Sequence, residues 1–370
     1  MLKQTGNPQG KYPRTINKEG ILVFTSMYDW TPGFFPGTLW YLYELTGEDH
    51  WKAEAVKWTE SLEPLKTFTG HHDLGFMMYC SYGNAYRLDP NEKYKEILVE
   101  SANSLSTRFN PVTRTIKSWN YRKAWNDTIE WFYPVIIDNM MNLEMLFFAS
   151  KVTGDKKYYD IAVSHANTTI KNHLRSDYSS YHVVDYDTIS GTVKCQATCQ
   201  GYSDNSTWAR GQAWGIYGFT MMFRETGDSV YLNVAKKMTD WYLKTPNLPA
   251  DKVPYWDFNA GQAGYEPEGT SKAKMITEKY RDASAAAVVA SALFELGEFT
   301  KNEVYLKTAV DMVHTLSSPA YRAILGQSGN FILMHSVGSI PHGAEIDVPL
   351  VYADYYFIEA LVRYKRMLDK

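Results

Sequence analysis

Apolar and polar positions along this chain alternate between two kinds of helical segment. One kind is apolar on nearly every side and covers residues 34–44, 74–86, 140–150, 213–223 and 284–296. A helix without a polar face is typical of a buried position. The other kind is amphipathic, with its charges on one face, and covers residues 93–105, 157–173, 230–244 and 304–316. The pattern therefore predicts buried helices that are each followed by an outer helix.

Short turns of similar composition join the two helices of a pair. Gly47, Gly154 and Gly227 end apolar segments, and an acidic residue follows each of them. Glycine adopts the left-handed conformation that ends a helix, and an acidic residue favours the start of the next one. A last apolar helix, at 355–367, can form a sixth pair with a helix near the N-terminus. This internal repeat predicts an all-α fold, an (α/α)6 toroid formed by a single domain over residues 1–370.

Long loops precede several of the buried helices, at residues 106–137, 174–207 and 245–281, and they are rich in Trp, Tyr, Asn, His and Asp. The inner helices of such a toroid run in the same direction, so their N-termini meet at one end. Strand signals are sparse and predict only a small hairpin, at 181–187 and 191–194, within one of the loops. Because binding residues concentrate on long loops held by a rigid scaffold, we expect the functional site at this end.

The overall composition excludes several classes of protein. Lys and Arg number 38 against 41 Asp and Glu, so no strong field attracts nucleic acid or an anionic membrane, and we expect neither as a partner. No apolar run is expected to span a membrane. Residues 1–6 contain no apolar signal region, which predicts a cytoplasmic protein, or a periplasmic one whose signal is processed or trimmed. Three cysteines cannot form a disulfide framework, and their spacing does not match a zinc site. Aromatic residues make up 15%, which suits packing between large helices and also a carbohydrate site.

Four of the buried helices begin at an aspartate, namely Asp73, Asp138, Asp282 and Asp354. Aspartate is a preferred N-cap, and for Asp282 and Asp354 that interpretation suffices. Asp73 differs because it follows two histidines, and Asp138 differs because it follows a loop with three tryptophans. Two carboxyl groups that face one cavity can have their pKa values pushed apart, so that one acts as an acid while the other stays ionised. Glycoside hydrolases typically use such a pair of carboxyl groups.

Arg210 is the clearest cation at this end of the predicted toroid, and it stands between Trp208 and Trp214. Such an arginine is either a structural residue stacked on aromatic rings or a fork that binds a substrate carboxylate. His182 and Gln200, in the preceding loop, can supply directional hydrogen bonds. The sequence at His71, His72 and Asp73 lacks the helical spacing of metal ligands, so no metal site is predicted there.

Four separated motifs resemble those of one known family, the unsaturated glucuronyl hydrolases of glycoside hydrolase family 88. The motifs follow in order over residues 29 to about 358: Asp29-Trp30-Thr31-Pro32-Gly33-Phe34-Phe35, His72-Asp73-Leu74-Gly75-Phe76, Ile137-Asp138-Asn139-Met140-Met141-Asn142 and Trp208-Ala209-Arg210-Gly211-Gln212-Ala213-Trp214. Unsaturated rhamnogalacturonyl hydrolases share the fold, but their arginine motif looks different.

The resemblance implies an (α/α)6 barrel that removes a C4=C5 unsaturated glucuronic acid from the non-reducing end of lyase-generated oligosaccharides. Members hydrate the vinyl ether, and the resulting hemiketal opens and expels the remaining sugar. Asp138 matches the general acid/base, and Asp73 matches the second essential carboxylate. The positions that match the substrate subsite are Trp30, His72, Trp119, His182, Gln200, Trp208, Arg210 and Trp214.

The resemblance also implies an uronate-containing oligosaccharide as substrate, no metal or organic cofactor, and a monomer or weak homodimer. The protonation state of Asp138 stays open, because apolar neighbours raise a carboxyl pKa and a helix N-terminus lowers it. Sulfation preference stays open too. Some members hold a sulfate with Ser and Lys of a C-terminal loop, and here residues 335–343 contain Ser and His but no Lys.

Three other functions remain compatible with these residues. An inverting glycosidase would use the two carboxylates with a water between them, and it would cleave saturated substrates. A sugar epimerase on the same toroid would use His71 and His72 as bases. A sugar-binding protein without activity would use the same aromatic residues.

Overall fold

Six inner helical segments form a closed ring in the computed structural model, which describes residues 1–370 with the exception of the Lys3 side chain. They are α2 (Phe34–Thr46), α4 (Leu74–Met78) continued by η2 (Tyr79–Gly83) and α5 (Asn84–Leu88), α7 (Leu143–Thr153), α9 (Ala209–Thr226), α11 (Ala283–Thr300) and α13 (Val351–Leu368). Each segment contacts the next in this order, and α13 closes the ring against α2. The predicted (α/α)6 toroid is confirmed.

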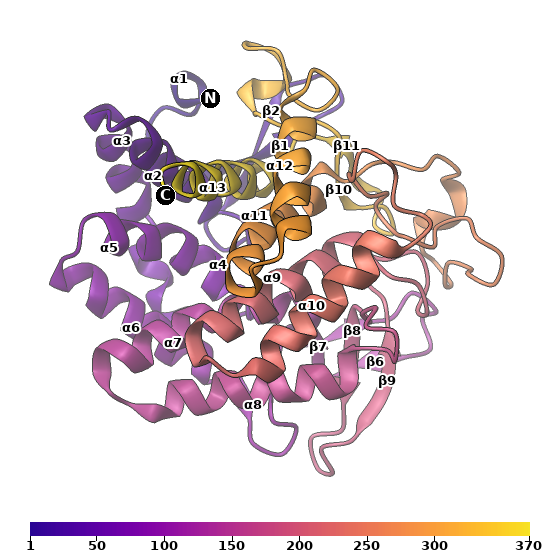
Figure 1. The fold of residues 1–370 in the computed structure, drawn as a ribbon. Coiled ribbons are helices and arrows are strands. Elements are labelled where there is room, and N and C mark those ends of the chain that lie inside the picture. Colours follow the sequence, from indigo (N-terminus) through magenta and orange to yellow (C-terminus); the bar gives the residue numbers. More distant parts are fainter.

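Five outer helices surround this ring, and each follows the inner helix that it packs on (Figure 1). They are α3 (Asp49–Glu60), α6 (Glu92–Ser106), α8 (Lys156–His173), α10 (Ser229–Lys244) and α12 (Glu303–Ser317). Gly47, Gly154 and Gly227 end their inner helices in the left-handed conformation, with φ of +70°, +74° and +69°. The helix pairs and their turns are therefore as predicted.

The expected helix near the N-terminus, as outer partner of the sixth inner helix, was wrong. That region contains only the single turn α1 (Leu2–Thr5), followed by the antiparallel strands β1 (Lys11–Ile16) and β2 (Leu22–Ser26). Pro13 and several β-branched residues in these strands disfavour helix and suit an edge strand. The inner layer therefore has all six helical segments, whereas the outer layer has no long helix at its sixth position among the described residues.

Two inner helices depart from the continuous segments that the pattern predicted. Residues 74–88 are interrupted by the π-helical segment η2, and α7 is preceded by the 3₁₀ helix η3 (Ile137–Asn142). Hydrophobic periodicity did not reveal these backbones, because segments of 5 and 6 residues are too short to distinguish one helical period from another.

The predicted hairpin in the loop before α9 is confirmed as β8 (Val183–Tyr186) and β9 (Val193–Ala197). A third strand, β7 (Pro134–Ile136), pairs with β8 and leads directly into η3. The remaining strands form two-stranded antiparallel ladders in loops: β3 (Phe109–Asn110) with β4 (Thr115–Ile116), β5 (Arg122–Lys123) with β6 (Glu130–Trp131), and β10 (Ser336–Ser339) with β11 (Ala344–Val348).

Asp282 and Asp354 were both expected to cap inner helices, but only Asp282 does so. The Asp282 carboxylate accepts the N–H groups of Ser284 and Ala285 and so caps α11, as predicted. The cap expected at Asp354 was wrong, because α13 begins earlier, at Val351. The Asp354 carboxylate instead accepts the N–H groups of Ile332 and Leu333, both at 2.9 Å, and fixes the loop before β10.

Helix α11 is long and apolar enough to cross a membrane, although no such run was expected from the sequence. In the structure, 78% of its 18-residue apolar window is buried inside the protein. Its apolar character is that of an inner helix of the ring, in contact with α9, α12 and α13.

Close approach of helices requires glycine at one position that bears on the site. An added Cβ at Gly218 of α9 would lie 2.5 Å from Cβ of Met140 in η3. Exchange of a helical glycine for alanine ordinarily stabilises a protein by about 0.5–1 kcal/mol. Here we expect Gly218→Ala to lower the free energy of unfolding by about 1–3 kcal/mol, because the core has no room for a methyl group. Urea denaturation measures this change, and a stabilised variant would contradict the close packing.

Candidate active site

Asp138 is placed by the junction of a strand and a 3₁₀ turn. Ile136 ends β7 opposite Val183 of β8, and the N–H of Ile137 donates to the carbonyl of His182 at 3.1 Å. The chain then turns into η3, whose N-cap is Ile136, so Asp138 lies within the turn and makes no side-chain cap bond. Asp138 therefore does not cap a helix, although aspartate at a helix start often does. The residue is 7% exposed, and Oδ2 has no hydrogen-bond partner among the described residues.

A cavity of about 340 Å³ lies next to Asp138 at the end of the barrel where the inner helices begin. It receives Trp30 from the start of α2, Asp73 from the start of α4 and Arg210 from the start of α9. The rest of its wall comes from β1, the start of α13, the β10–β11 hairpin, and loops with their short strands: Arg14, Trp119, Arg122, Ile136, Cys199, Gln200, Gly338, Ser339, His342, Ala344, Glu345 and Tyr352. The two aspartates expected to work as a pair thus line one cavity.

Asp73 is held by the two histidines before it. Its Oδ2 lies 3.1 Å from Nδ1 of His71, and its Oδ1 lies 3.3 Å from Nε2 of His72. Although Asp73 is the N-cap residue of α4, its carboxylate makes no cap bond. It is therefore oriented by side chains and not by the helix terminus.

The amide of Asn142 sets the tautomer of His72 behind Asp73. Oδ1 of Asn142 accepts the N–H of Phe76 at 3.0 Å, so its Nδ2 is the donor to Nδ1 of His72 at 3.2 Å. The His72 proton then resides on Nε2, which faces Asp73. Burial lowers the pKa of His72 to about 4, so this ring is neutral.

The pKa values of the two aspartates move in opposite directions. Burial, reinforced by the charge of Asp73, raises the pKa of Asp138 to about 7, although Arg210 counteracts this. Burial also favours a raised pKa at Asp73, but His72 and His71 outweigh it and the pKa ends below its ordinary value. Burial lowers the pKa of His71, yet its ion pair with Asp73 leaves that pKa raised. Asp138 is thus suited to donate a proton near neutral pH, while Asp73 stays ionised.

His182 presents an N–H to Asp138 from behind the cavity wall. Its Nδ1 accepts the N–H groups of Cys199 and Gln200, at 3.0 and 3.1 Å, so the proton is on Nε2. That Nε2 lies 3.8 Å from Oδ2 of Asp138. Burial, together with the charges of Arg122 and Arg210, lowers the pKa of His182 well below its ordinary value. His182 is therefore a neutral donor, able to support the carboxylate of Asp138 when it forms.

Arg210 is anchored on three sides, with only 1% of it exposed. Its Nη1 donates to Asp282 Oδ2 at 2.9 Å and to the carbonyl of Val337, and its Nη2 donates to the carbonyl of Gly338 at 2.7 Å. The guanidinium also lies over the Trp208 ring, 4.6 Å from its centroid. Most of the fork is therefore structural. Nε has no partner among the described residues, and it and the second Nη2 proton remain for a ligand.

The other residues expected at the substrate divide into two groups. Trp30, Trp119 and Gln200 line the cavity, and Nε2 of Gln200 also donates to Gly338 at 3.2 Å. His72, His182, Trp208 and Trp214 are buried and do not line it. Trp208 stacks beside His182 with ring centroids 4.5 Å apart, and Trp214 lies close enough to Asp138 to counteract the rise in its pKa.

Several lining residues were not found from the sequence. Arg14 bridges Asp29 and Glu345, which joins the N-terminal hairpin to β11. Arg122 lies over the Trp119 ring at 5.0 Å and contacts His342. Tyr352 stands at the start of an inner helix, where the sequence already located other site residues. Arg122, in the short strand β5, and His342, in the turn between β10 and β11, stand in stretches without a distinguishing sequence pattern. The described residues contain no group of three or more His, Cys, Asp or Glu side chains arranged to hold a metal ion.

Comparison with known proteins identifies the family. The profile of Glycosyl Hydrolase Family 88 matches residues 9–247. An unsaturated glucuronyl hydrolase of Formosa agariphila is 50% identical over 361 residues, which are 97% of this chain and 86% of that protein. The chain belongs to Glycosyl Hydrolase Family 88. The resemblance carried by the four motifs is confirmed, and this family 88 protein is an enzyme of the hydrolase class.

Two further relatives show the range of substrates within this similarity. An unsaturated chondroitin disaccharide hydrolase of Streptococcus pneumoniae is 32% identical, over 95% of this chain and 86% of that protein. The crystal structure of an unsaturated glucuronyl hydrolase specific for heparin superposes with a TM-score of 0.90 at 45% identity, covering 99% of this chain and 94% of that one. The whole fold is shared, while the named substrates differ.

The raised pKa of Asp138 predicts a pH-dependent cost in stability. Its pKa is about 7 in the folded protein against 3.8 in the unfolded chain, so folding is penalised progressively as pH rises from 3.8 to 7. Asp138→Asn removes this penalty, which at pH 8 is on the order of 4 kcal/mol. We expect the free energy of unfolding of the variant, relative to the parent, to increase between pH 5 and pH 8 in urea titrations.

Asp354→Asn is the matched comparison for that experiment. Burial raises the pKa of Asp354 to about 7 as well, and the residue lies outside the cavity. The same pH trend is expected there. A stability difference for Asp138→Asn that stays constant with pH would show that its carboxyl ionises at its ordinary pKa.

Proposed function

We propose that this family 88 hydrolase removes C4=C5 unsaturated glucuronic acid from the non-reducing end of oligosaccharides that polysaccharide lyases release from glycosaminoglycans. The observation that carries the proposal is the pair Asp73 and Asp138 on one cavity, with pKa values shifted in opposite directions. The relatives named for unsaturated glucuronyl and unsaturated chondroitin disaccharide hydrolysis support it.

The reaction begins with protonation of a carbon, which requires an acid that still holds its proton near neutral pH. Asp138, with a pKa of about 7, gives its proton to C4, and positive charge develops on C5 and the ring oxygen. Water adds to C5 and returns a proton to the Asp138 carboxylate. The hemiketal then opens to a ketone at C5, and the freed hydroxyl at C1 collapses to an aldehyde that expels the second sugar. One water is consumed, and Asp138 ends as it began.

The other groups of the site act on the charge that develops in this step. The ionised Asp73 stabilises the positive ring, and the face of Trp119 suits the same flattened cation. His182 donates its Nε2–H toward Asp138 when that residue becomes a carboxylate. The free N–H groups of Arg210, together with Gln200, bind the carboxylate of the uronate. His72, Trp208 and Trp214 position these residues from behind.

The leaving sugar is expected on the side of the cavity formed by Arg122, Ser339 and His342. Ser339 shares a hydrogen bond with Nδ1 of His342, and Arg122 contacts the opposite nitrogen of that ring. Arg122 has no carboxylate partner among the described residues, so it can pair with an anionic group on that sugar. Arg122 thus supplies a cation where the loop 335–343 contains no lysine.

Activity is tested with unsaturated disaccharides from chondroitin, hyaluronan and heparin, each in sulfated and unsulfated form. Hydration removes the conjugated C=C–COO⁻ group, so ultraviolet absorbance should disappear with turnover. Asp138→Asn should lower kcat by roughly a hundredfold to ten-thousandfold, because general acid–base catalysis contributes about that much. Asp354→Asn, an equally buried aspartate outside the cavity, should retain activity. Absence of bleaching on every disaccharide would refute the proposal, and cleavage of saturated substrates would indicate an inverting glycosidase instead.

The pH dependence of kcat/KM provides a second test. Asp138 must be protonated, so kcat/KM should fall as pH rises through about 7. Asp73 must be ionised, and because its pKa lies below the ordinary value, no loss is expected on the acid side until well below pH 5. His71→Ala removes the ion pair that lowers this pKa and should shift the acid limb to higher pH without moving the basic limb. A basic limb that does not appear by pH 9 would assign the proton donor to another group.

A further inference from the structure

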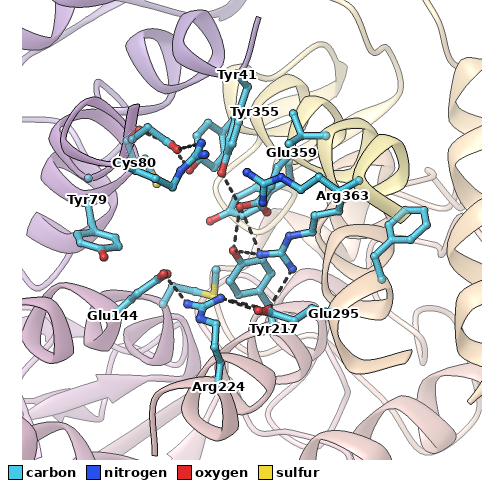
Figure 2. A pocket seen from close by; sticks show the side chains of 18 of the residues that line it. Tyr41, Tyr79, Cys80, Glu144, Tyr217, Arg224, Glu295, Tyr355, Glu359 and Arg363 are labelled. Carbon is cyan, nitrogen blue, oxygen red and sulfur yellow. Dashed lines mark hydrogen bonds and ion pairs between the residues drawn. The ribbon is translucent and has the colours of Figure 1, made fainter. Parts of the chain in front are cut away.

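A second and larger cavity extends into the barrel toward the C-terminal ends of the inner helices (Figure 2). Its volume is about 670 Å³, against about 340 Å³ for the cavity with the two aspartates. All six inner segments contribute to its wall, through Tyr41, Tyr79, Glu144, Tyr217, Glu295 and Glu359 among others. No residue lines both cavities. The larger one is therefore separate from the proposed active site.

Charged groups around this cavity pair with one another and leave no net charge. Glu295 binds Arg224 and Arg363, and Glu359 also pairs with Arg363. The remaining pairs are Glu44 with Arg87 and Arg366, Glu144 with Arg224, and Glu298 with Lys370. Glu225 also pairs with Arg224 and with Lys151, so the network holds six carboxylates and six cations. A ligand with a net charge would find no counter-charge, so the balance favours a neutral one.

Three polar groups of the wall keep free hydrogen-bonding capacity after these pairs are made. Glu144 is bonded to Arg224 through one oxygen only, and its side chain is 25% exposed. Burial raises the pKa of Glu144 to about 7, so this carboxyl loses its proton near neutral pH. Tyr356 lines the cavity, and its hydroxyl has the thiol of Cys80, a weak hydrogen-bonding group, as its partner. The hydroxyl of Tyr79 forms no hydrogen bond with a described residue, and Figure 2 shows Tyr79 beside Glu144 on one wall.

Aromatic rings form the wall next to these polar groups. The Phe148 ring lies 5.9 Å from that of Tyr79 and 5.1 Å from that of Tyr86, measured between centroids. The Tyr79 ring rests on Gly83, where an added Cβ would lie 2.9 Å from it. Both residues belong to η2, the π-helical segment that interrupts the inner helix, and such segments are frequent at functional sites. Apolar ring surface and free hydrogen-bonding groups are thus adjacent.

We propose that this cavity is a second binding site for a neutral saccharide of one or two units. The sugar hydroxyls bond with the free oxygen of Glu144 and the hydroxyls of Tyr79 and Tyr356. The C–H face of the ring lies on the aromatic wall of Tyr79, Tyr86 and Phe148. The cavity volume is within the range of about 300–1,000 Å³ that small-molecule sites occupy.

Titration calorimetry with N-acetylglucosamine, N-acetylgalactosamine, galactose and cellobiose tests this site in the whole enzyme. The titrations are run at pH 8.5, where Glu144 is ionised because its pKa is about 7. We expect at least one of these sugars to bind, and Glu144→Gln to weaken its binding about tenfold by loss of a charge-assisted acceptor. Tyr356→Phe keeps the ring packing and should weaken binding severalfold. This second variant still tests the site if Glu144→Gln does not fold. Trp119→Ala, which alters the other cavity, should leave the affinity unchanged.

Turnover of unsaturated disaccharide separates this site from the proposed function. Glu144→Gln and Tyr356→Phe should retain the kcat/KM of the parent, because neither residue lines the cavity of Asp138. Crystals soaked in the bound sugar should show it against Tyr79 and Glu144. The proposal is overturned if no sugar of the panel binds near its solubility limit, if the sugar lies only beside Asp138, or if neither variant changes the affinity.

Discussion

The amide of Asn142 connects the two helix starts on which the chemistry depends. Asn142 ends the η3 turn that carries Asp138, and its side chain bonds both to Phe76 of α4 and to His72, the residue before Asp73. The contact is possible because Gly75 has no side chain, since a Cβ there would lie 2.5 Å from Cα of Asn142. One side chain thus fixes the relative position of the two aspartates and also the tautomer of the histidine between them.

The burial of Asp138 that makes it a proton donor also lowers the free energy of unfolding. A carboxyl buried beside a second carboxylate holds its proton near neutral pH, and at higher pH its ionisation opposes folding. Such strain at an active site is common, and the surrounding scaffold compensates for it. In this barrel the compensation includes the closed apolar ring and the buried network in which Glu359 accepts from Tyr41, Tyr217 and Ser291.

The same six inner helices present different surfaces at their two ends. At their beginnings, loops and short strands narrow the opening and supply tryptophan, histidine and arginine around an acid pair. Toward their ends, short turns leave a wider cavity in which every lining charge has a partner. Loop length therefore decides which end of the barrel carries out chemistry, because the long connections all precede inner helices.

The sequence by itself determined five of the six helix pairs, the left-handed glycines between helices, the hairpin before α9 and the four motifs that identified the family. These features depend on residues close together along the chain, through periodicity, capping and turn chemistry. The tertiary structure decided what Asp138, Asp354 and Arg210 do with their charges. The carboxylate of Asp138 turned away from its helix terminus, that of Asp354 bound a loop 21 residues away, and the guanidinium of Arg210 bound a strand 128 residues away. A side chain's hydrogen-bond partners, burial and pKa depend on groups that only folding brings near it, and local sequence carries no signal for them.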